Sequence, residues 1–312
     1  MNKKSKKALV LLNMGGARNK NELKMFLTNM FNDKNILTIK SSFLRSLLAK
    51  LIVSSRLNAA WKNYEKIGNE SPLNPLTEKL VKKLDEILKD VYVFQAMRYT
   101  PPFANECIEE LKNKGIKEVV LLPLYPQYST TTTKSSVEDF LEFAEDNFSI
   151  EVIDPFYKNE IFNEAIINTI SNTVEDYSQY NLIFSAHGLP QKIVDSGDPY
   201  QKHVQEHVEI LSNKLEEKGL RFKSISLAYQ SKVGPMKWLE PALDDRLKDF
   251  KNEKVLIYPI AFIVDNSETD FELSIEYKEV ADEIGIVDYK VCKCVNDDDK
   301  FIEAIKDITK LS

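Results

Sequence analysis

The chain has 312 residues, of which 43% are hydrophobic and 29% are charged, and its formal net charge is −6 at pH 7. This composition is that of a soluble globular protein with one large core or two medium ones. The negative charge argues against nucleic acid as a partner, and no apolar run reaches the roughly 20 residues of a membrane-spanning helix. We therefore expect a cytoplasmic protein.

The chain begins with MNKKSKKALVLLNMGG, a basic tip followed by an apolar run, which is also the pattern of an export signal. The apolar run is too short for one, and it continues into Gly15 and Gly16 without a small-residue cleavage site. We predict a first strand here. The two glycines do not form a dinucleotide-binding fingerprint, because no G-x-G-x-x-G is present.

The segment 34–64 contains no Asp or Glu, but it contains six Lys or Arg residues among many apolar ones. A basic, strongly apolar helix is typical of an interfacial helix or of a lip over an apolar ligand. The alternative is an ordinary core helix whose lysines are solvated. We expect a movable lip that contacts a membrane surface, which would make the protein peripheral on the inner face of the membrane.

Apolar, β-branched runs predict eight strands, over residues 8–14, 91–97, 118–126, 150–156, 181–187, 224–230, 254–263 and 289–295. Continuous apolar runs are typical of strands that parallel sheets bury on both faces. Amphipathic stretches at 103–114, 199–218 and 299–310 predict helices between them, so the fold class is α/β.

Four strands in each half predict two similar doubly wound, Rossmann-like domains, residues 1–152 and 153–312, each with a four-stranded parallel sheet. We expect the last helix, about 299–310, to pack back on the first domain. Ligands of such folds bind outside the carboxyl ends of the strands. Polar or Gly-rich turns follow six strands, at 13–16, 98–99, 125–136, 185–187, 230–232 and 265–268, which predicts a cleft between the domains.

His187 is one of only three histidines, and it ends the strand-like run NLIFSAH before Gly188. An imidazole in a cleft can accept a proton or bind a metal; the alternative is a structural histidine satisfied by hydrogen bonds. His203 and His207 have the i, i+4 spacing of metal ligands, but no third ligand accompanies them, so we interpret them as a surface pair.

Four acidic residues, Asp265, Glu268, Glu272 and Glu276, step by three, four and four residues. On a helix they form one stripe whose like charges repel, so the stripe costs stability. A solvated helix face is the simpler interpretation. An acidic ladder that begins at a strand end also suits a path for a divalent cation, which prefers oxygen ligands.

The three cysteines, Cys107, Cys292 and Cys294, are too few for a four-thiolate cluster or zinc site in one chain. We expect reduced thiols, with Cys292 and Cys294 on opposite faces of the last strand.

Seven segments, in order, resemble those of the ferrochelatases: LLNMGGARNKNELKMFLTNMFND, YEKIGNESPL, AMRYTPP, LPLYPQYSTTTTKSS, SAHGLP with GDPY, QSKVGPMKWLEP and DNSETDFELSIEY. The resemblance spans nearly the whole chain. It implies insertion of Fe²⁺ into protoporphyrin IX to give protohaem, with release of two protons, in the last step of haem biosynthesis. Iron is then a substrate, with no permanently bound cofactor and no iron–sulfur cluster.

The resemblance implies roles for individual residues. His187 and Glu268 are the catalytic pair. The residues that contact the metal are His187, Glu268, Asp265, Glu272 and Glu276. The porphyrin-binding residues are Met14, Arg56, Tyr64, Ser71, Arg98, Tyr99, Tyr125, Ser129, Thr130, Ser231 and Trp238. Two positions depart from the family pattern, which often has His at Asn266 and Gly at Lys134.

The expected partners are protoporphyrin IX and Fe²⁺, with hand-over from the preceding porphyrin-oxidising enzyme. Three alternatives remain: a coproporphyrin ferrochelatase, a cobalt or nickel chelatase for another tetrapyrrole, and a non-catalytic ligand-binding protein. Apolar residues such as Phe43 and Leu47 beside few bases in segment 34–64 favour protoporphyrin, which has two propionates, over coproporphyrin, which has four.

Overall fold

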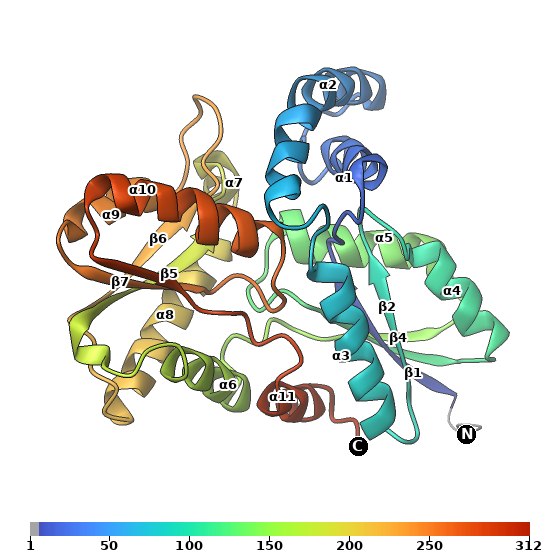
Figure 1. The fold of residues 1–312 in the computed structure, drawn as a ribbon. Helices are drawn as coiled ribbons and strands as arrows, with labels where there is room; N and C mark the ends of the chain where they lie inside the picture. Colours follow the sequence, from blue (N-terminus) through green and yellow to red (C-terminus); the bar gives the residue numbers. More distant parts are fainter. Residues whose placement is uncertain (1–5) are drawn as a thin grey trace. The chain divides into compact units, whose positions relative to one another are not determined.

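The computed structural model describes residues 6–312 and divides into two compact units (Figure 1). The first unit comprises the chain up to Tyr125, Ser129–Asp154 and Lys306–Ser312. The second comprises Pro126–Tyr128 and Pro155–Ile305. The division at Asp154 and Pro155 lies two residues after the predicted limit at 152, and residues 126–128 and 306–312 are exchanged between the halves.

The first unit is built from strands that alternate with helices. Its elements are β1 (Lys7–Asn13), α1 (Lys20–Asn32), α2 (Ser42–Lys66), α3 (Leu73–Ile87), β2 (Tyr92–Met97), α4 (Ala104–Asn113), β3 (Glu118–Pro123), the π-helix η1 (Thr130–Lys134), α5 (Ser135–Ala144) and β4 (Ser149–Val152).

The second unit repeats this alternation. Its elements are α6 (Glu160–Ser171), the short 3₁₀ helix η2 (Tyr177–Gln179), β5 (Tyr180–His187), α7 (Gln191–Asp195), α8 (Tyr200–Glu217), β6 (Ser224–Gln230), α9 (Leu243–Leu247), the short 3₁₀ helix η3 (Lys248–Phe250), β7 (Lys254–Pro259), the π-helix η4 (Glu268–Glu276), α10 (Tyr277–Ile284), β8 (Asp288–Val291) and the beginning of α11 (Asp299–Thr309).

Both sheets are parallel and have the same strand order, β2-β1-β3-β4 in the first unit and β6-β5-β7-β8 in the second. The predicted fold class, with four parallel strands in each half, is thereby confirmed. In each sheet the strand order reverses beside the first strand of the unit. Ligands of doubly wound folds bind at this position, outside the carboxyl ends of the strands. In the second unit this point lies between β5 and β7.

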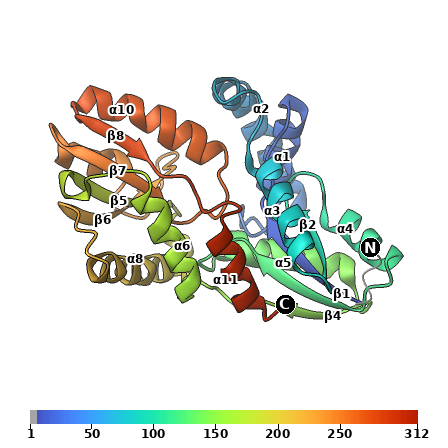
Figure 2. The ribbon, with the colours of Figure 1, turned by 60° about the horizontal axis from the view of Figure 1, so that its bottom comes forward.

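Apolar side chains from the strands form a core on each sheet. In the first unit, Val10 and Leu12 pack with residues of α4 and α5. In the second, Ile183 and Ile257 pack with residues of α9, η4 and α10. Helices α6 and α8 cover the other face of the second sheet (Figures 1 and 2). The continuous apolar runs of the sequence therefore reflect burial on both faces.

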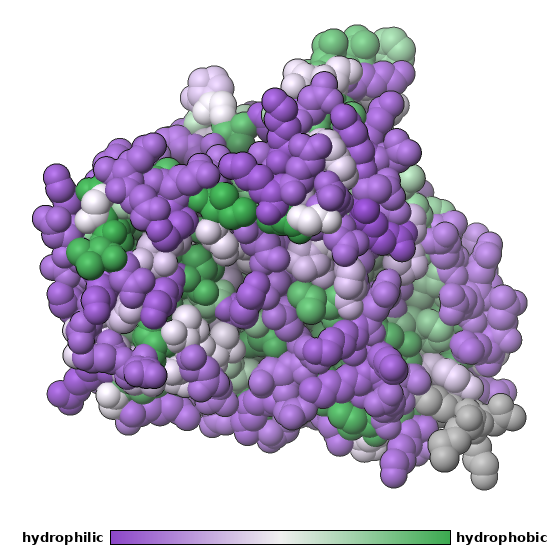
Figure 3. Space-filling model, viewed as in Figure 1, coloured by the Kyte–Doolittle hydropathy of each residue, from purple (hydrophilic) through white to green (hydrophobic). Residues whose placement is uncertain are grey.

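Residues 42–64 of the basic segment 34–64 lie in α2 and make up most of that helix. The C-terminal half of α2 packs on α1, where Tyr64 is buried beside Leu23. The N-terminal half leaves an apolar row exposed, with Phe43 at 75% and Leu51 at 64% exposure, and with Leu44, Leu47 and Leu48 between them. The hydrophobic surface at the top of Figure 3 lies over this helix. Within residues 6–312, no helix is both long and apolar enough to cross a membrane.

Two local expectations about the last strand differ from the structure. β8 ends at Val291, so Cys292 and Cys294 lie in the segment after it and not on opposite faces of a strand. Both thiols are buried and free, as is Cys107. The apolar run in the sequence continues past the strand because the segment that follows is buried as well.

Candidate functional site

His187 lies at the carboxyl end of β5, beside the point where the sheet winding reverses. Its Nδ1 lies 2.8 Å from Glu268 Oε2. The buried Tyr200, at the start of α8, donates its hydroxyl hydrogen to the backbone carbonyl of His187 at 2.9 Å. The imidazole is 38% exposed, and its Nε2 has no hydrogen-bond partner within residues 6–312. One ring nitrogen is thus held by a carboxylate and the other is available to a ligand.

Glu268 is the first residue of the π-helix η4, and Asn266 fixes that start. The buried Asn266 accepts a hydrogen bond from Glu268 N at 2.8 Å, and its own Nδ2 donates to Val264 O at 3.1 Å. The residue that departs from the family pattern therefore positions the backbone of the carboxylate that binds His187. A π-helix also has wider turns than an α-helix, and such segments are frequent at functional sites.

The two charges of the pair stabilise each other. Burial by itself lowers the pKa of His187, but the charge of Glu268 and the hydrogen bond to it outweigh burial and raise this pKa to about 9. Burial raises the pKa of Glu268, but the charge of His187 and its hydrogen bond outweigh this and lower it. At neutral pH, without substrates, the pair is an imidazolium and a carboxylate.

Glu272, one turn further along η4, shares two hydrogen-bond donors with Glu268. Ser231 Oγ lies 2.7 Å from Glu272 Oε2 and 3.2 Å from Glu268 Oε2. Gln230 Nε2 lies 3.3 Å from each of these oxygens. Burial and the charge of Glu268 raise the pKa of Glu272 to about 7. This side chain can therefore exchange a proton near neutral pH.

The acidic stripe is shorter than expected. Glu276, at the end of η4, is exposed. The buried Asp265 instead accepts hydrogen bonds from Cys294 N at 3.0 Å and Asn296 Nδ2 at 2.9 Å, and Lys293 lies 3.6 Å away. The carboxylate of Asp265 therefore holds the segment after β8, and a role of Asp265 in a metal path stays a prediction.

The expected metal ligands are not assembled as a ligand cluster. Within the described part of the chain, no group of three or more His, Cys, Asp or Glu side chains is placed to hold a metal ion. His187 and Glu268 instead bind each other through Nδ1 and Oε2, which leaves His187 Nε2 for a ligand.

The expectation that His203 and His207 form a surface pair is wrong for His207. His207 is fully buried, with Nδ1 2.8 Å from Gln127 Nε2 and Nε2 2.8 Å from Asn163 Oδ1. Burial lowers its pKa to about 3. His203 stacks on Tyr157 at 4.8 Å and accepts a hydrogen bond from Tyr128 N on Nδ1. Both rings are neutral packing elements, and neither has a nitrogen lone pair free for a metal.

Nine of the expected porphyrin-binding residues lie in the first unit. Five of these are buried: Tyr64, Ser71, Tyr99, Tyr125 and Ser129. The hydroxyl groups of the last four have hydrogen-bond partners inside the unit, and the ring of Tyr64 stacks on Trp61. Met14 and Thr130 are partly exposed, and Arg56 is exposed. These bonds give the buried residues structural roles that the sequence pattern did not indicate; Tyr125, for example, contacts Ser136 at 3.1 Å.

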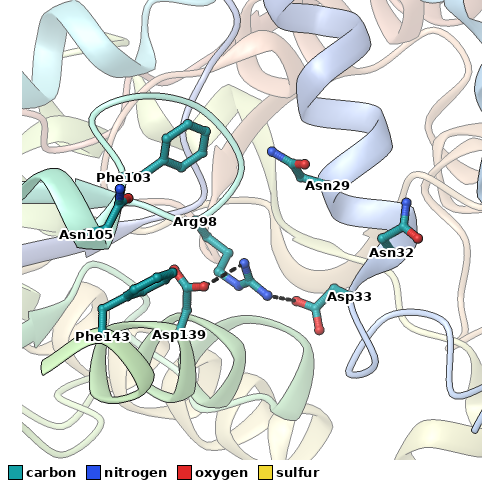
Figure 4. A pocket seen from close by; sticks show the side chains of 8 residues that line it. All are labelled: Asn29, Asn32, Asp33, Arg98, Phe103, Asn105, Asp139 and Phe143. Carbon is teal, nitrogen blue, oxygen red and sulfur yellow. Dashed lines mark ion pairs between the residues drawn. The ribbon is translucent and has the colours of Figure 1, made fainter. Parts of the chain in front are cut away.

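Arg98, the ninth, lines a cavity of about 330 Å³ in the first unit (Figure 4). Its Nε donates to Ser135 Oγ at 2.9 Å, and its terminal nitrogens form ion pairs with Asp33 at 3.4 Å and Asp139 at 3.0 Å. Tyr99 also donates to Asp33, at 2.8 Å. A propionate would therefore have to compete with two carboxylates for this guanidinium.

The other two expected residues, Ser231 and Trp238, lie in the second unit. Ser231 has a φ of 66°, in the left-handed region, and its hydroxyl faces the two glutamates. Trp238 donates Nε1–H to Val233 O at 3.0 Å across the loop between β6 and α9. Gln230 belongs to the strand-end turn 230–232, and that position was a signal for a site residue, although the sequence pattern assigns it no individual role.

Comparison with known proteins identifies the family of this chain. A family model described as Ferrochelatase matches residues 6–312. The ferrochelatase of Sulfurimonas denitrificans is 53% identical, with 97% of this chain and 98% of that protein covered. The ferrochelatase of Helicobacter pylori strain HPAG1 is 42% identical, with 99% of this chain and 94% of that protein covered.

Solved structures show the same fold at low sequence identity. SirB from Bacillus subtilis with Fe³⁺ has a TM-score of 0.58 and 11% identity, and the match covers 97% of this chain and 94% of that one. The sirohydrochlorin chelatase SirB of subspecies spizizenii, in complex with cobalt, has a TM-score of 0.59 and 10% identity. These chelatases share the fold. The match to the family model over residues 6–312, and the 42–53% identity to the two ferrochelatases, are far more specific than the shared fold. They show that the chain belongs to the ferrochelatase family.

Proposed function

We propose that the protein inserts Fe²⁺ into protoporphyrin IX, giving protohaem and releasing two protons, as the last step of haem biosynthesis. The observation that carries the proposal is the pair of His187 and Glu268, a base and its carboxylate partner, at the strand end where ligands of this fold bind. Membership of the ferrochelatase family supports it.

His187 accepts the pyrrole protons at Nε2, because Nδ1 is engaged by Glu268. Glu268 holds the ring in one orientation and stabilises the imidazolium that forms, as a carboxylate does for a catalytic histidine. The raised pKa of His187, about 9, makes it a strong proton acceptor once it has lost the proton of the resting state. Chemistry at Nε2 therefore requires the neutral imidazole.

Iron reaches this pair along η4. Glu268, Glu272 and Glu276 are spaced four residues apart, from the half-buried pair of His187 and Glu268 to the exposed end of the π-helix. Carboxylate oxygens can bind Fe²⁺ in place of the water molecules of its hydration shell. Along the row, the ion binds the next carboxylate before the previous carboxylate releases it. Protons leave along the same row, because burial and the charge of Glu268 raise the pKa of Glu272 to about 7.

The choice of protoporphyrin over coproporphyrin rests on α2. Its exposed row, including Phe43, Leu47 and Leu51, suits the two vinyl groups of protoporphyrin better than two further propionates. Two of the five N–H donors of Arg45 are already engaged, by Asn32 O at 2.7 Å and Ile39 O at 2.8 Å, so its guanidinium is partly committed within the unit. Lys34 pairs with Glu138 at 3.3 Å.

The test is an anaerobic assay in which the purified protein receives Fe²⁺ and either porphyrin, and kcat/KM is compared. We expect a haem spectrum and a preference for protoporphyrin. A preference for coproporphyrin would assign the protein to the coproporphyrin-dependent route. His187→Ala should abolish insertion while protoporphyrin still binds, because the apolar contacts remain; turnover above a tenth of wild type would contradict the base assignment.

We further propose that this cytoplasmic protein contacts the membrane surface through α2, where the preceding porphyrin-oxidising enzyme hands over its poorly soluble product. The apolar row is accompanied by Lys40 and Lys50, which have no ion-pair partner within residues 6–312. Such a helix binds anionic lipid weakly and in a salt-dependent way. Flotation with liposomes of anionic and of neutral lipid tests this. Equal flotation of wild type and Leu47→Ser/Leu51→Ser would contradict it.

A further inference from the structure

Gln230 is the last residue of β6, and the register of the sheet pairs it with His187. Its side chain is fully buried. Gly188 donates its backbone N–H to Gln230 O at 2.8 Å, and a Cβ on Gly188 would lie 2.7 Å from that oxygen. The glycine after His187 therefore lets the two strand ends lie this close together.

The amide of Gln230 has a fixed orientation. Ser185 Oγ donates to Gln230 Oε1 at 2.8 Å, so Nε2 faces the two glutamates. An amide nitrogen carries two hydrogens. Nε2 lies 3.3 Å from both Glu268 Oε2 and Glu272 Oε2, so one hydrogen is available for each carboxylate.

Two carboxylates on successive helical turns repel each other. Within residues 6–312, the side chains of Gln230 and Ser231 lie close to both carboxylates. Ser231 Oγ is close to both oxygens but carries a single hydrogen, which it donates to one carboxylate at a time. The amide of Gln230 has no such limit. We propose that Gln230, oriented by Ser185, is a positioning residue that holds Glu268 and Glu272 together as a pair of oxygen ligands for the incoming iron beside His187.

This inference rests on the proposed iron insertion and adds to it. Groups that orient metal ligands typically contribute about 10–100-fold to metal affinity or activity. Gln230→Met keeps the length of the side chain and removes both donors. We expect it to raise KM for Fe²⁺ about tenfold or more, with the affinity for protoporphyrin unchanged. Ser185→Ala should raise KM for Fe²⁺ less, because the freed amide can still turn its nitrogen toward the carboxylates.

The chain offers a matched control for each variant. Gln95 in β2 has a buried Oε1 and Ser226 in β6 a buried Oγ, neither with a hydrogen-bond partner within residues 6–312. Gln95→Met and Ser226→Ala make the same exchanges elsewhere in the sheets, and KM for Fe²⁺ should stay at the wild-type value. The double variant Ser185→Ala/Gln230→Met should be no worse than Gln230→Met, since Ser185 acts only through Gln230.

A second measurement separates this inference from the proposed function. Titration of the porphyrin-free protein with Co²⁺ alone, followed by calorimetry, reports metal affinity even if the wild type inserts no iron. We expect about a tenfold weaker affinity for Gln230→Met. Wild-type Co²⁺ affinity in Gln230→Met would overturn the inference, as would additive effects in the double variant. If Gln230→Met does not fold, the Ser185→Ala variant is the test. A KM for Fe²⁺ equal to that of Ser226→Ala would then overturn the inference about Gln230.

Discussion

Replacing Glu268 by Gln removes the charge that keeps His187 protonated. In the wild type the pKa of His187 is raised to about 9, because the charge and hydrogen bond of Glu268 outweigh burial. In Glu268→Gln, burial is the strongest remaining effect, and it lowers the pKa against the weaker charge of Glu272. We expect the pKa to fall from about 9 to below the ordinary 6.5, which is a loss of proton affinity of about 300-fold or more.

NMR titration of the ring carbons of ¹³C-labelled histidine measures this directly. The chain has only three histidines, and they should titrate in three separate ranges. His187 should titrate at about 9, His203 below 6.5 because it is partly buried, and His207 at about 3 because it is fully buried. Loss of one signal in His187→Asn assigns the resonance.

Glu276→Gln is the matched control, because Glu276 lies at the exposed end of the same helix and contributes nothing to the pKa of His187. It should leave that pKa at about 9. A wild-type His187 that titrates at or below 6.5 would refute the ion pair. A His187 that stays near 9 in Glu268→Gln would refute the assignment of the shift to Glu268.

Substitutions at four residues separate the roles of the acidic residues and their neighbour Ser231. Glu276→Gln should raise KM for Fe²⁺ with kcat nearly unchanged, whereas Glu268→Gln should cripple kcat; equal losses of kcat would contradict a delivery path. Asp265→Asn should destabilise the protein by about 1.5–3 kcal/mol in chemical denaturation, because it weakens buried charge-assisted bonds, and should leave KM for Fe²⁺ unchanged. Ser231→Ala and Ser231→Gly should raise the pKa of Glu272 above 7 alike, since both remove the same hydrogen bond; carboxylate NMR that distinguishes them would implicate the left-handed backbone instead.

The central strands, β1, β3, β5 and β7, were predictable because they are buried on both faces, whereas the edge strand β4 is largely exposed. β5 begins at Tyr180 and ends at His187, within one residue of the predicted strand 181–187, and β6 matches 224–230. The parallel strand order then places His187 and Gln230 side by side at one edge of the sheet. The sequence alone predicts only that each residue ends a strand. The register that makes them neighbours depends on pairing between segments 43 residues apart.

The π-helical form of η4 was not predictable from the acidic spacing. Carboxylates four residues apart lie near one face in an α-helix and in a π-helix, so the same pattern fits both. Asp265 precedes the helix, and only the tertiary contact with Asn296 reveals its role. For His207 a signal was present and missed: Val204, His207, Leu211 and Leu215 form the buried stripe of α8, with helical spacing.

The burial of His207 predicts how stability depends on pH. Its pKa is lowered from the ordinary 6.5 to about 3 in the folded protein, so the unfolded chain binds a proton at pH values where the folded protein does not. The stability is therefore complete above pH 6.5 and is lost as the pH falls through the window from 6.5 to about 3. At pH 5 the loss due to His207 is about 2 kcal/mol.

Urea denaturation of the wild type and of His207→Gln, at pH 7.5 and at pH 5, tests this. A glutamine can donate to Asn163 and accept from Gln127, as His207 does, but it does not titrate. The variant should therefore gain about 2 kcal/mol relative to the wild type when the pH falls to 5. His203→Gln is the control, with a smaller gain because His203 is only partly buried. Parallel pH dependence in the wild type and His207→Gln would mean that the His207 ring takes up a proton without unfolding, and the neutral assignment would be wrong.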